Sequence, residues 1–332
     1  MTASPMPVIF DPVFVPKPWG GRRLENLLGK RLPPGELIGE SWELASLPGC
    51  ESRVRDGPLA GRTLGELVEA WGTAVCAASE LSNGRFPLLT KFLDAHELLS
   101  IQVHPRTVPD SPSTAAAGVK DEAWYVVHAE PGAELYLGVN VGVSAADLAG
   151  AAGTPQLPDL LRRWPVKPGE CFYLPSGTIH ALGAGIVVAE VQLASDVTYR
   201  LYDWGRTGFD GRPRELHVED ALQHARVDSA AGARVRAVRR LAHAGLMMDE
   251  LVRSSRFRLD RVRLAPAANK PLWHTEPAVW MILGGVGNLA CEGGPVRFGK
   301  GDTLLMPACG ATRTVEVLAE CELLEIRTTA RR

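Results

Sequence analysis

Ser100-Ile101-Gln102-Val103-His104-Pro105 combines the apolar alternation of a β-strand with two side chains that can bind a metal ion. Because successive side chains of a strand point to opposite faces, Gln102 and His104 share one face. If that face lines the interior of a β-barrel, an amide and an imidazole meet there and can hold a divalent ion. We therefore expect this segment to carry part of a metal site inside a barrel.

The other ligands are predicted from two places further along the chain. His180 ends the pattern G-x5-P-x-G-x2-H of residues 169–180, which resembles the second motif of a cupin barrel. Glu122 precedes the strand-like residues 123–127, so it is either a solvated charge at a strand start or a ligand that faces inward. Two imidazoles, a carboxylate and an amide oxygen suit zinc or another borderline divalent ion, with one position left for substrate. No comparable pattern surrounds the remaining histidines, which are His96, His128, His217, His224, His243 and His274.

Short apolar runs bounded by glycine and proline dominate the sequence. The chain contains 34 glycines and 25 prolines, and the runs between them are rich in Val, Ile, Tyr and Phe, which is typical of short strands. The runs cover residues 8–16, 97–105, 123–129, 133–139, 170–175 and 185–193. This pattern predicts a mainly β protein.

Helical patterns are confined to a few segments, which we expect to lie around the sheets. Thr63-x-x-Glu66 and Ser144-x-x-Asp147 have the spacing of capping boxes, which satisfy free N–H groups at the start of a helix. Two further helix candidates span residues 158–164 and 218–227.

The chain is predicted to contain two β domains. We expect a catalytic domain at residues 1–227, a connector at 228–249 and a degenerate C-terminal β domain at 250–332. Residues 228–245 are rich in Ala and Arg and lack strand alternation, which favours a connector there.

A repeated motif indicates that the second domain is an internal duplication of the first. The G-x5-P spacing of residues 169–175 recurs at 301–307. The position equivalent to His180 is Thr312, and Cys309 stands where the motif has its second glycine. The C-terminal barrel is therefore predicted to be structural and free of metal.

Length and composition describe an ordinary globular protein. A chain of 332 residues is long enough for two domains, and a formal net charge of -2 provides no basic excess for nucleic acid. The N-terminus lacks a signal-peptide pattern, and no segment approaches the roughly 18 consecutive apolar residues of a membrane span. The six cysteines form no CxxC pair and are expected to be reduced. We expect a cytoplasmic protein that binds neither nucleic acid nor membrane.

Several motifs between residues 13 and 206 occur in a distinctive order. They are Lys17-Pro18-Trp19-Gly20-Gly21, Gly39-Glu40-Ser41-Trp42-Glu43, Phe86-Pro87-Leu88-Leu89-x-Lys91, Leu99-Ser100-x-Gln102-x-His104-Pro105, Lys120-x-Glu122 and Ser195-Asp196-x3-Arg200. Together they resemble the class I mannose-6-phosphate isomerases, in the short form found in bacteria. The chain departs from that family at Val197, where asparagine is usual, and lacks the large helical insertion of the longer eukaryotic members.

This resemblance implies a fold, a cofactor and a set of site residues. The implied fold is two double-stranded β-helix barrels of the cupin or jelly-roll type in tandem, with a few peripheral helices. One zinc ion per chain is implied at Gln102, His104, Glu122 and His180. An active-site role is implied for Arg200, substrate contacts for Lys91, Ser100 and Lys120, and a place in the pocket for Glu190.

The implied reaction interconverts D-mannose 6-phosphate and D-fructose 6-phosphate. A proton leaves one carbon and returns to its neighbour through an enediol, and a metal near the sugar oxygens stabilises the developing negative charge. The general acid or base stays open among Glu190, Lys120 and a metal-bound water. The sequence has no glycine-rich phosphate loop. Side chains must therefore bind the phosphate, with Arg200 as first choice and Lys91 and Ser100 as helpers.

Two other kinds of protein are compatible with these residues. A cupin barrel supports many chemistries, so a metal-dependent oxygenase is one alternative, although a neutral Gln ligand with Lys and Arg nearby fits it less well. A non-catalytic sugar-phosphate sensor is the other, but all four ligand positions and Arg200 are present. The sequence leaves the breadth of aldose specificity, the pathway and the oligomeric state open, with a monomer favoured.

Overall fold

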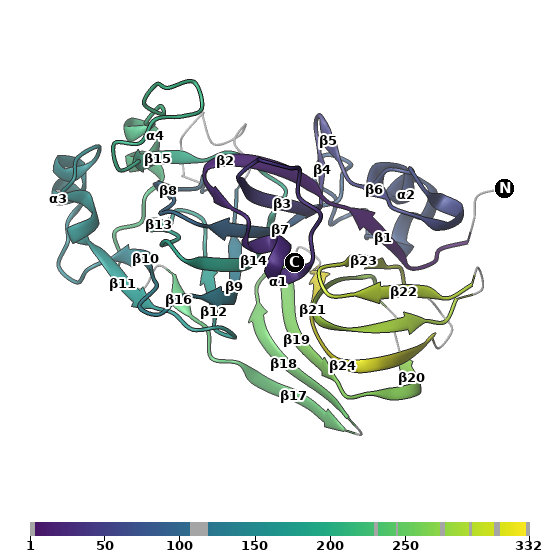
Figure 1. Ribbon diagram of the computed structural model, residues 1–332. Coiled ribbons are helices and arrows are strands. Elements are labelled where there is room, and N and C mark those ends of the chain that lie inside the picture. Colours follow the sequence, from purple (N-terminus) through teal and green to yellow (C-terminus); the bar gives the residue numbers. More distant parts are fainter. Residues whose placement is uncertain are drawn as a thin grey trace.

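The computed structural model describes residues 4–106, 119–228, 232–243, 245–272, 276–291, 294–308 and 313–329. Strands dominate these residues and form two β-rich parts that pack side by side, with the helices at the periphery (Figure 1). The prediction of a mainly β protein is confirmed. In these ranges no helix has the length and apolar character needed to cross a membrane.

The N-terminal part is built from two sheets that face each other. A seven-stranded sheet contains β2 (Val13–Gly21), β3 (Ile38–Leu44), β7 (Leu88–Ala95), β9 (Glu122–Ala129), β12 (Cys171–Leu174), β14 (Ile186–Leu193) and β16 (Ala233–Arg234). A five-stranded sheet contains β8 (Ile101–Val103), β10 (Glu134–Val139), β11 (Leu161–Pro165), β13 (His180–Ala181) and β15 (Tyr199–Tyr202). Leu93 and Trp124 of the first sheet share an apolar cluster with Leu135 and Leu137 of the second, so the sheets enclose one interior.

Both faces of the central strands in the seven-stranded sheet are buried. On β14, Val188 belongs to the interior cluster, whereas Val187 belongs to a second cluster on the outer face. The same alternation places Trp124 of β9 inside and Tyr125 outside. One sheet therefore forms a wall of the barrel interior and also the surface on which the C-terminal part packs.

The C-terminal part is one ten-stranded sheet. Most of its strands come from the end of the chain: β17 (Val238–His243), β18 (Leu246–Arg253), β19 (Phe257–Leu264), β20 (Ala267–Leu272), β21 (Ala278–Leu289), β22 (Val296–Gly299), β23 (Thr303–Met306) and β24 (Arg313–Thr328). The other two are β1 (Val8–Asp11) and β6 (Arg53–Val54), and Val8 of β1 pairs antiparallel with Leu305 of β23. Trp280 and Phe298 belong to a separate apolar cluster in this part. A further short pair is formed by β4 (Ser46–Leu47) and β5 (Cys50–Glu51).

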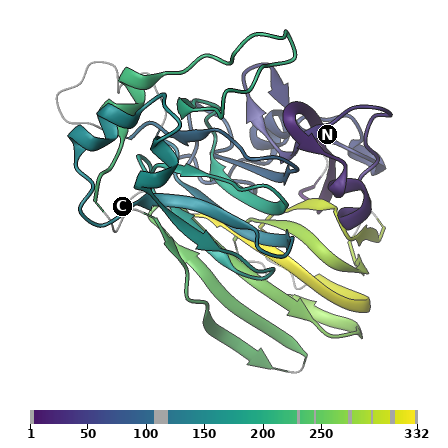
Figure 2. The ribbon, with the colours of Figure 1, turned by 60° about the vertical axis from the view of Figure 1, so that its left-hand side comes forward.

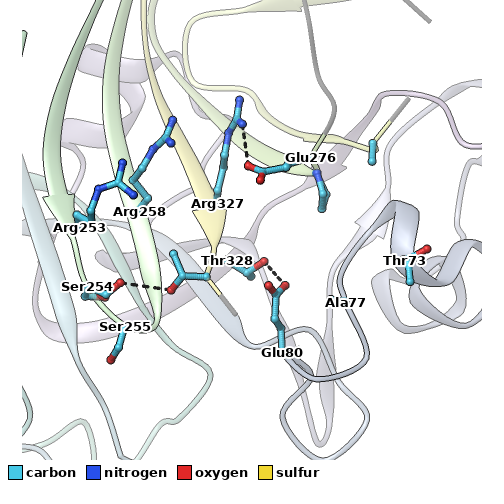
Figure 3. Close-up of a pocket in the computed structure, with 13 residues that line it drawn as sticks. Thr73, Ala77, Glu80, Arg253, Ser254, Ser255, Arg258, Glu276, Arg327 and Thr328 are labelled. Carbon is cyan, nitrogen blue, oxygen red and sulfur yellow. Dashed lines mark hydrogen bonds and ion pairs between the residues drawn. The ribbon is translucent and has the colours of Figure 1, made fainter. Parts of the chain in front are cut away.

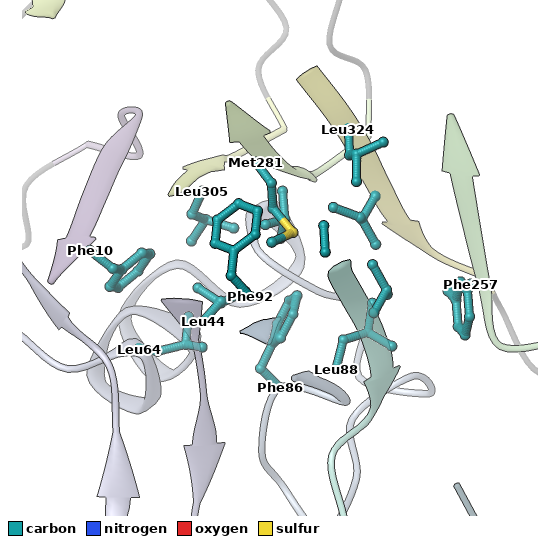
Figure 4. Packing of buried hydrophobic residues seen from close by; sticks show 14 of the residues in the cluster. Phe10, Leu44, Leu64, Phe86, Leu88, Phe92, Phe257, Met281, Leu305 and Leu324 are labelled. Carbon is teal, nitrogen blue, oxygen red and sulfur yellow. The ribbon is translucent and has the colours of Figure 1, made fainter. Parts of the chain in front are cut away.

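One hydrophobic core joins the two parts (Figure 4). Phe86, Leu88 and Phe92 from the N-terminal part belong to the same cluster as Met281 and Leu324 from the C-terminal part. Removing such side chains from water stabilises the packed state by roughly 25 cal/mol per Å² of apolar surface. The two parts are therefore held together by a continuous core rather than by a surface contact.

The repeated motif has the same local structure in both parts. Gly169 has a φ of 89° and Gly301 a φ of 87°, a backbone conformation that favours glycine. After each glycine, a four-residue strand, β12 or β23, ends just before the proline of the motif. Cys309 and Thr312 lie outside the described residues, so a metal-free second barrel stays a prediction.

Three of the four predicted helices are present among the described residues. The helices are α1 (Arg23–Leu28), α2 (Leu64–Trp71), α3 (Ala145–Ala151) and α4 (Val218–His224), with 3-10 turns at η1 (Gly57–Leu59), η2 (Gly72–Ala74) and η4 (Leu157–Leu160). The capping boxes at Thr63 and Ser144 are confirmed, since each side chain accepts a hydrogen bond from the backbone N–H three residues later. The prediction of a helix at 158–164 is wrong, because most of that segment belongs to β11, which pairs with β10. Pairing within the sheet outweighs the local helical pattern.

Strands occur in the segment 228–249, which was predicted as a connector. It contains β16, β17 and the start of β18. Every residue of β17 is exposed, which explains why its sequence does not alternate between apolar and polar residues. Arg239 and Arg240 of this strand pair with Asp249 and Glu250 of β18. The division into a catalytic domain, a connector and a C-terminal domain stays a prediction.

Candidate metal centre and substrate pocket

Three side chains that can bind a metal ion meet between the two sheets of the N-terminal part. His104 directly follows β8, Glu122 begins β9 and His180 begins β13. His180 pairs with Gln102 in the five-stranded sheet, and Glu122 reaches the two histidines from the seven-stranded sheet. The ligand atoms of His104, Glu122 and His180 all lie within 4.8 Å of one another, and all three residues are buried.

Backbone carbonyls fix the orientation of both imidazoles. Nδ1 of His104 lies 3.0 Å from the carbonyl oxygen of Val197, and Nδ1 of His180 lies 2.8 Å from that of Thr178. Because a carbonyl only accepts, each Nδ1 carries the proton and each Nε2 presents a lone pair. The two Nε2 atoms lie 3.1 Å and 3.5 Å from the carboxylate oxygens of Glu122. Metal-binding histidines are held in this way.

One carboxylate oxygen of Glu122 has no hydrogen-bond partner among the described residues. Its Oε1 lies 2.8 Å from Nζ of Lys120, whereas its Oε2 is buried and receives no hydrogen bond from the residues that the structure describes. A buried carboxylate oxygen without a donor is costly unless a cation compensates it. This oxygen and the two lone pairs of the imidazoles therefore fit a divalent ion.

Gln102, the fourth predicted ligand, belongs to the same group. Its amide nitrogen lies 3.2 Å from Nε2 of His180, and its Oε1 accepts a hydrogen bond of 3.3 Å from the hydroxyl of Ser100. A flip of the side-chain amide would exchange its oxygen and nitrogen and bring Oε1, which is the metal-binding atom, next to His180. The side chain can therefore complete the ligand set without a change in the backbone.

The protonation states of these residues suit metal binding. Burial lowers the pKa of His180 to about 4 and also lowers the pKa of His104, so both imidazoles are neutral at pH 7. Burial alone would raise the pKa of Glu122, but His104 and Lys120 outweigh it and hold that pKa well below its usual value. Neutral imidazoles and an ionised carboxylate are the forms that bind metals.

A cavity of about 280 Å³ lies beside the metal-binding group. Gln102, Lys120 and Glu122 form part of its wall, so the cavity and the group are continuous. The other residues predicted to contact substrate or to act in catalysis also line it: Lys91, Ser100, Glu190 and Arg200. The fold therefore gathers all the predicted site residues around one space.

Lys91 lies between two buried carboxylates in this cavity. Its Nζ is 3.2 Å from Glu40 and 3.7 Å from Glu190. The indole N–H of Trp42 donates to Glu40 at 2.7 Å, and that of Trp124 donates to Glu190 at 2.8 Å. Burial alone would lower the pKa of Lys91, but the two carboxylates raise it above its usual value. Burial raises the pKa of Glu190 to about 7, so this carboxyl can gain or lose a proton near neutral pH.

Two arginines form another wall of the cavity. Nε of Arg200 is buried and has no hydrogen-bond partner among the residues that the structure describes. Nη1 of the same side chain lies 3.5 Å from the carbonyl oxygen of Glu215. Burial lowers the pKa of Arg200, and the positive charge of Arg214 lowers it further. Arg214 is paired with Asp203 at 3.2 Å. Two neighbouring guanidinium groups, one with an unsatisfied N–H, suit an anionic group such as phosphate.

Glu40, Arg214 and His217 also line the cavity, although they were not predicted from the sequence to be pocket residues. Glu40 belongs to the motif at 39–43, and alternation along β3 puts it on the same face as Trp42, so the sequence contains a signal for it. Arg214 and His217 come from the irregular segment between β15 and α4. No periodicity there predicts where a side chain points.

A two-sheet barrel with a histidine-glutamate-histidine group in its interior defines a cupin-type protein that can bind a metal ion. The chain is 34% identical to mannose-6-phosphate isomerase ManA of Bacillus subtilis over 316 residues, which are 95% of this chain and 97% of that protein. Residues 9–125 match the family description "Phosphomannose isomerase type I, catalytic domain". The chain belongs to the type I phosphomannose isomerase family.

Solved structures agree with this assignment. The crystal structure of the mannose 6-phosphate isomerase from Bacillus subtilis has a TM-score of 0.86 and 32% identity, and the match covers 97% of this chain and 100% of that one. A zinc-bound mannose 6-phosphate isomerase has a TM-score of 0.73 at 16% identity, over 97% of this chain and 99% of that one, which is a likeness in fold. The predicted family and its cupin fold are confirmed.

Proposed function

We propose that this chain is a mannose-6-phosphate isomerase, which interconverts D-mannose 6-phosphate and D-fructose 6-phosphate. The observation that carries the proposal is the cavity, which joins the group of His104, Glu122 and His180 to the guanidinium groups of Arg200 and Arg214. A sugar phosphate needs charge stabilisation at its carbonyl end and cations at its phosphate end. The similarity to the Bacillus subtilis isomerase over nearly the whole chain supports the same conclusion.

Gln102, His104, Glu122 and His180 are assigned as the ligands of one zinc ion per chain. The lone pairs of the two Nε2 atoms and the unpartnered Oε2 of Glu122 support this assignment, and a zinc-bound isomerase shares the fold. When bound, zinc would supply positive charge that stabilises the oxygens of an enediol.

The phosphate group of the substrate is assigned to Arg200 and Arg214. Nε of Arg200 needs an acceptor, and a guanidinium can bind phosphate through two N–H groups at once. The charge of Lys91 is already paired with two carboxylates, so this residue is not assigned to the phosphate alone. We assign Lys91 and Ser100 to contacts with other parts of the substrate as well. Binding of the remote phosphate positions the reacting carbons.

Glu190 is assigned the proton transfer. Its carboxylate takes the proton from C2 of open-chain mannose 6-phosphate and returns it to C1, while the hydroxyl proton moves from O2 to O1. The carbonyl thereby moves from C1 to C2. A pKa near 7 lets Glu190 both accept and donate the proton at neutral pH. We assign Lys120 to stabilising the negative charge that develops on the sugar oxygens. Glu190→Gln should abolish turnover without loss of bound metal.

A coupled assay tests the proposed function. The purified chain is supplied with mannose 6-phosphate, and fructose 6-phosphate formation is followed before chelation, after chelation and after zinc is restored. We expect turnover before chelation, no turnover after chelation, and turnover again once zinc is restored. Fully zinc-loaded protein that binds the sugar phosphate without turnover would instead favour a sensor, and oxygen consumption with an organic substrate would favour an oxygenase.

A cytoplasmic location and a monomeric state stay proposals. Cys50, Cys76, Cys171 and Cys321 are free thiols, which supports a reducing compartment. Cell fractionation tests the location, and analytical ultracentrifugation tests the monomer. Recovery in the membrane fraction, or sedimentation as a dimer, would contradict the respective proposal.

A further inference from the structure

A second cavity, of about 750 Å³, lies at the junction of the two parts (Figure 3). None of its lining residues also lines the substrate pocket. Its walls are the turn between β18 and β19, the end of β24 and residues of the segment that follows α2, such as Thr73 and Glu80. A molecule bound in this cavity would therefore contact both parts of the chain.

Three arginines stand side by side in one wall of this cavity. Arg253 of β18 pairs directly with Arg258 of β19, and Arg258 pairs directly with Arg327 of β24. Directly opposed residues point to the same face of a sheet, and the three guanidinium groups point the same way in Figure 3. Like charges in such positions destabilise a sheet unless other charges compensate them.

Carboxylates compensate most of the charge of this row. Each arginine has an acidic partner on its own strand, and the pairs are Arg253 with Glu250, Arg258 with Asp260 and Arg327 with Glu325. Arg258, in the middle, donates a hydrogen bond to Asp260 through Nε, and its two terminal nitrogens have no hydrogen-bond partner in the described part of the chain. A guanidinium has five N–H donors in one plane. Arg258 therefore presents free donors to the cavity.

The acidic residues of the cavity wall are already engaged. Glu80 accepts a hydrogen bond of 2.5 Å from the hydroxyl of Thr328, and Glu276 accepts one of 3.1 Å from Arg327. The hydroxyl of Ser255 adds a neutral donor to the lining. The donors that are left free favour an anion over a cation.

We propose that this cavity binds a small anionic metabolite through a phosphoryl or carboxylate group, which Arg258 holds with Arg253 and Arg327 beside it. Either group can accept two parallel N–H bonds from one guanidinium, and such charge-assisted bonds are roughly twice as strong as neutral ones. The proposal is independent of the proposed isomerase activity, because the two cavities have separate walls.

Arg253→Gln and Arg240→Gln form a matched pair of variants. Both arginines contact Glu250, on different carboxylate oxygens, and their side chains are 55% and 48% exposed. Arg253 lines the cavity, whereas Arg240 does not. Each substitution removes one positive charge and leaves Glu250 with one arginine, so the two variants differ in the cavity itself.

Isothermal titration calorimetry tests the proposal with inorganic phosphate, pyrophosphate and tricarballylate as probes. The titrations use the full chain with Arg200→Gln, which weakens anion binding in the substrate pocket. We expect saturable binding of a probe that Arg253→Gln weakens about tenfold and Arg240→Gln leaves unchanged. Binding of the phosphates alone would identify a phosphoryl ligand, and binding of tricarballylate alone a carboxylate ligand. No saturable binding, or equal affinities in the two variants at equal melting temperatures, would overturn the proposal.

Discussion

The imidazoles of the metal centre owe their orientation to backbone carbonyls rather than to side chains. His104 donates to the carbonyl of Val197 and His180 donates to that of Thr178. Val197 stands where asparagine is usual among the class I isomerases that the sequence resembles. Because its backbone makes the contact, the change of side chain leaves the orientation of His104 intact.

Replacing His104 by Ala should remove the metal from most of the protein. The variant leaves Gln102, Glu122 and one imidazole to hold the ion. Loss of a direct ligand should cost at least as much affinity as loss of a residue that only orients a ligand, which is about tenfold or more. Zinc per chain is measured by elemental analysis after dialysis. His128→Ala is the matched control, because His128 lies on β9 outside the metal-binding group. Zinc retained at one ion per chain would contradict the assignment of His104.

Metal-free protein should become less stable as the pH falls from about 6.5 to 4. Burial holds the pKa of His180 at about 4 in the folded chain, below its ordinary value near 6.5. In this window the unfolded chain binds a proton that the folded chain does not, so acid favours unfolding, by about 2 kcal/mol at pH near 5.

Glu190 has a raised pKa and acts in the opposite direction, so the experiment needs a comparison. The free energy of unfolding in urea is measured for the metal-free chain and for its His180→Asn variant, at a pH of about 7 and of about 5. Between these two pH values, the variant should lose less free energy of unfolding than the unsubstituted metal-free chain. The same loss in both proteins would count against a neutral His180.

On the scale of a strand, β3 serves two surfaces at once. Glu40 lines the substrate pocket and accepts a hydrogen bond from Trp42 on the same face, whereas Ser41 and Glu43 point to the other side, toward the C-terminal part. Gly39, just before them, lies against the neighbouring strand β2. The motif at 39–43 therefore combines a close contact between strands, a pocket residue and an interface residue.

Gly39→Ala should lower both the melting temperature and the turnover. A Cβ atom at this position would lie 2.6 Å from Cβ of Lys17 and 2.7 Å from the ring of Trp19. Lys17 pairs with Glu40 at 2.9 Å, so a shift of β2 would disturb the pocket. Gly150→Ala is the control, because a Cβ there meets nothing within 4 Å and alanine stabilises a helix by about 0.5–1 kcal/mol. Equal behaviour of the two variants would contradict this role of Gly39.

Elements with local signals could be predicted from the sequence, and elements that depend on distant partners could not. The helices after Thr63 and Ser144 have capping boxes within the segment itself. The segment at 158–164 became a strand because β10 pairs with it, and β17 is an exposed edge strand without an apolar face. In the site, strand alternation explains Gln102 and His104, whereas Arg214 depends on the path of an irregular segment.

At the scale of the whole molecule, a buried ion pair aligns the two parts. Nζ of Lys30 lies 2.6 Å from the carboxylate of Glu43 and donates at 2.6 Å to the carbonyl of Gly301. Glu43 also accepts hydrogen bonds from Ser41 at 2.6 Å and from Thr303 at 3.1 Å. Such a satisfied polar network favours one relative position of the two packed parts.

Glu43→Gln should destabilise the folded chain by about 3 kcal/mol, because Lys30 would keep its buried charge without a carboxylate. Urea unfolding measures the change, and the shared hydrophobic core should make both parts unfold in one transition. Glu134→Gln is the control, since Glu134 and Arg163 form an exposed pair whose loss should cost less than about 1 kcal/mol. A similar cost for both substitutions would contradict the alignment role of the buried pair.

The pairing of β1 with β23 has a consequence for the order in which this protein can fold during synthesis. Val8 leaves the ribosome early, but its partner Leu305 emerges only when most of the chain has been made. Until then Val8 and Ile9 of β1 present unpaired backbone groups of the kind that promote association with other chains. Contacts between such distant positions also slow folding. An N-terminal part that lacks the last strands should therefore associate with other chains more readily than the complete protein.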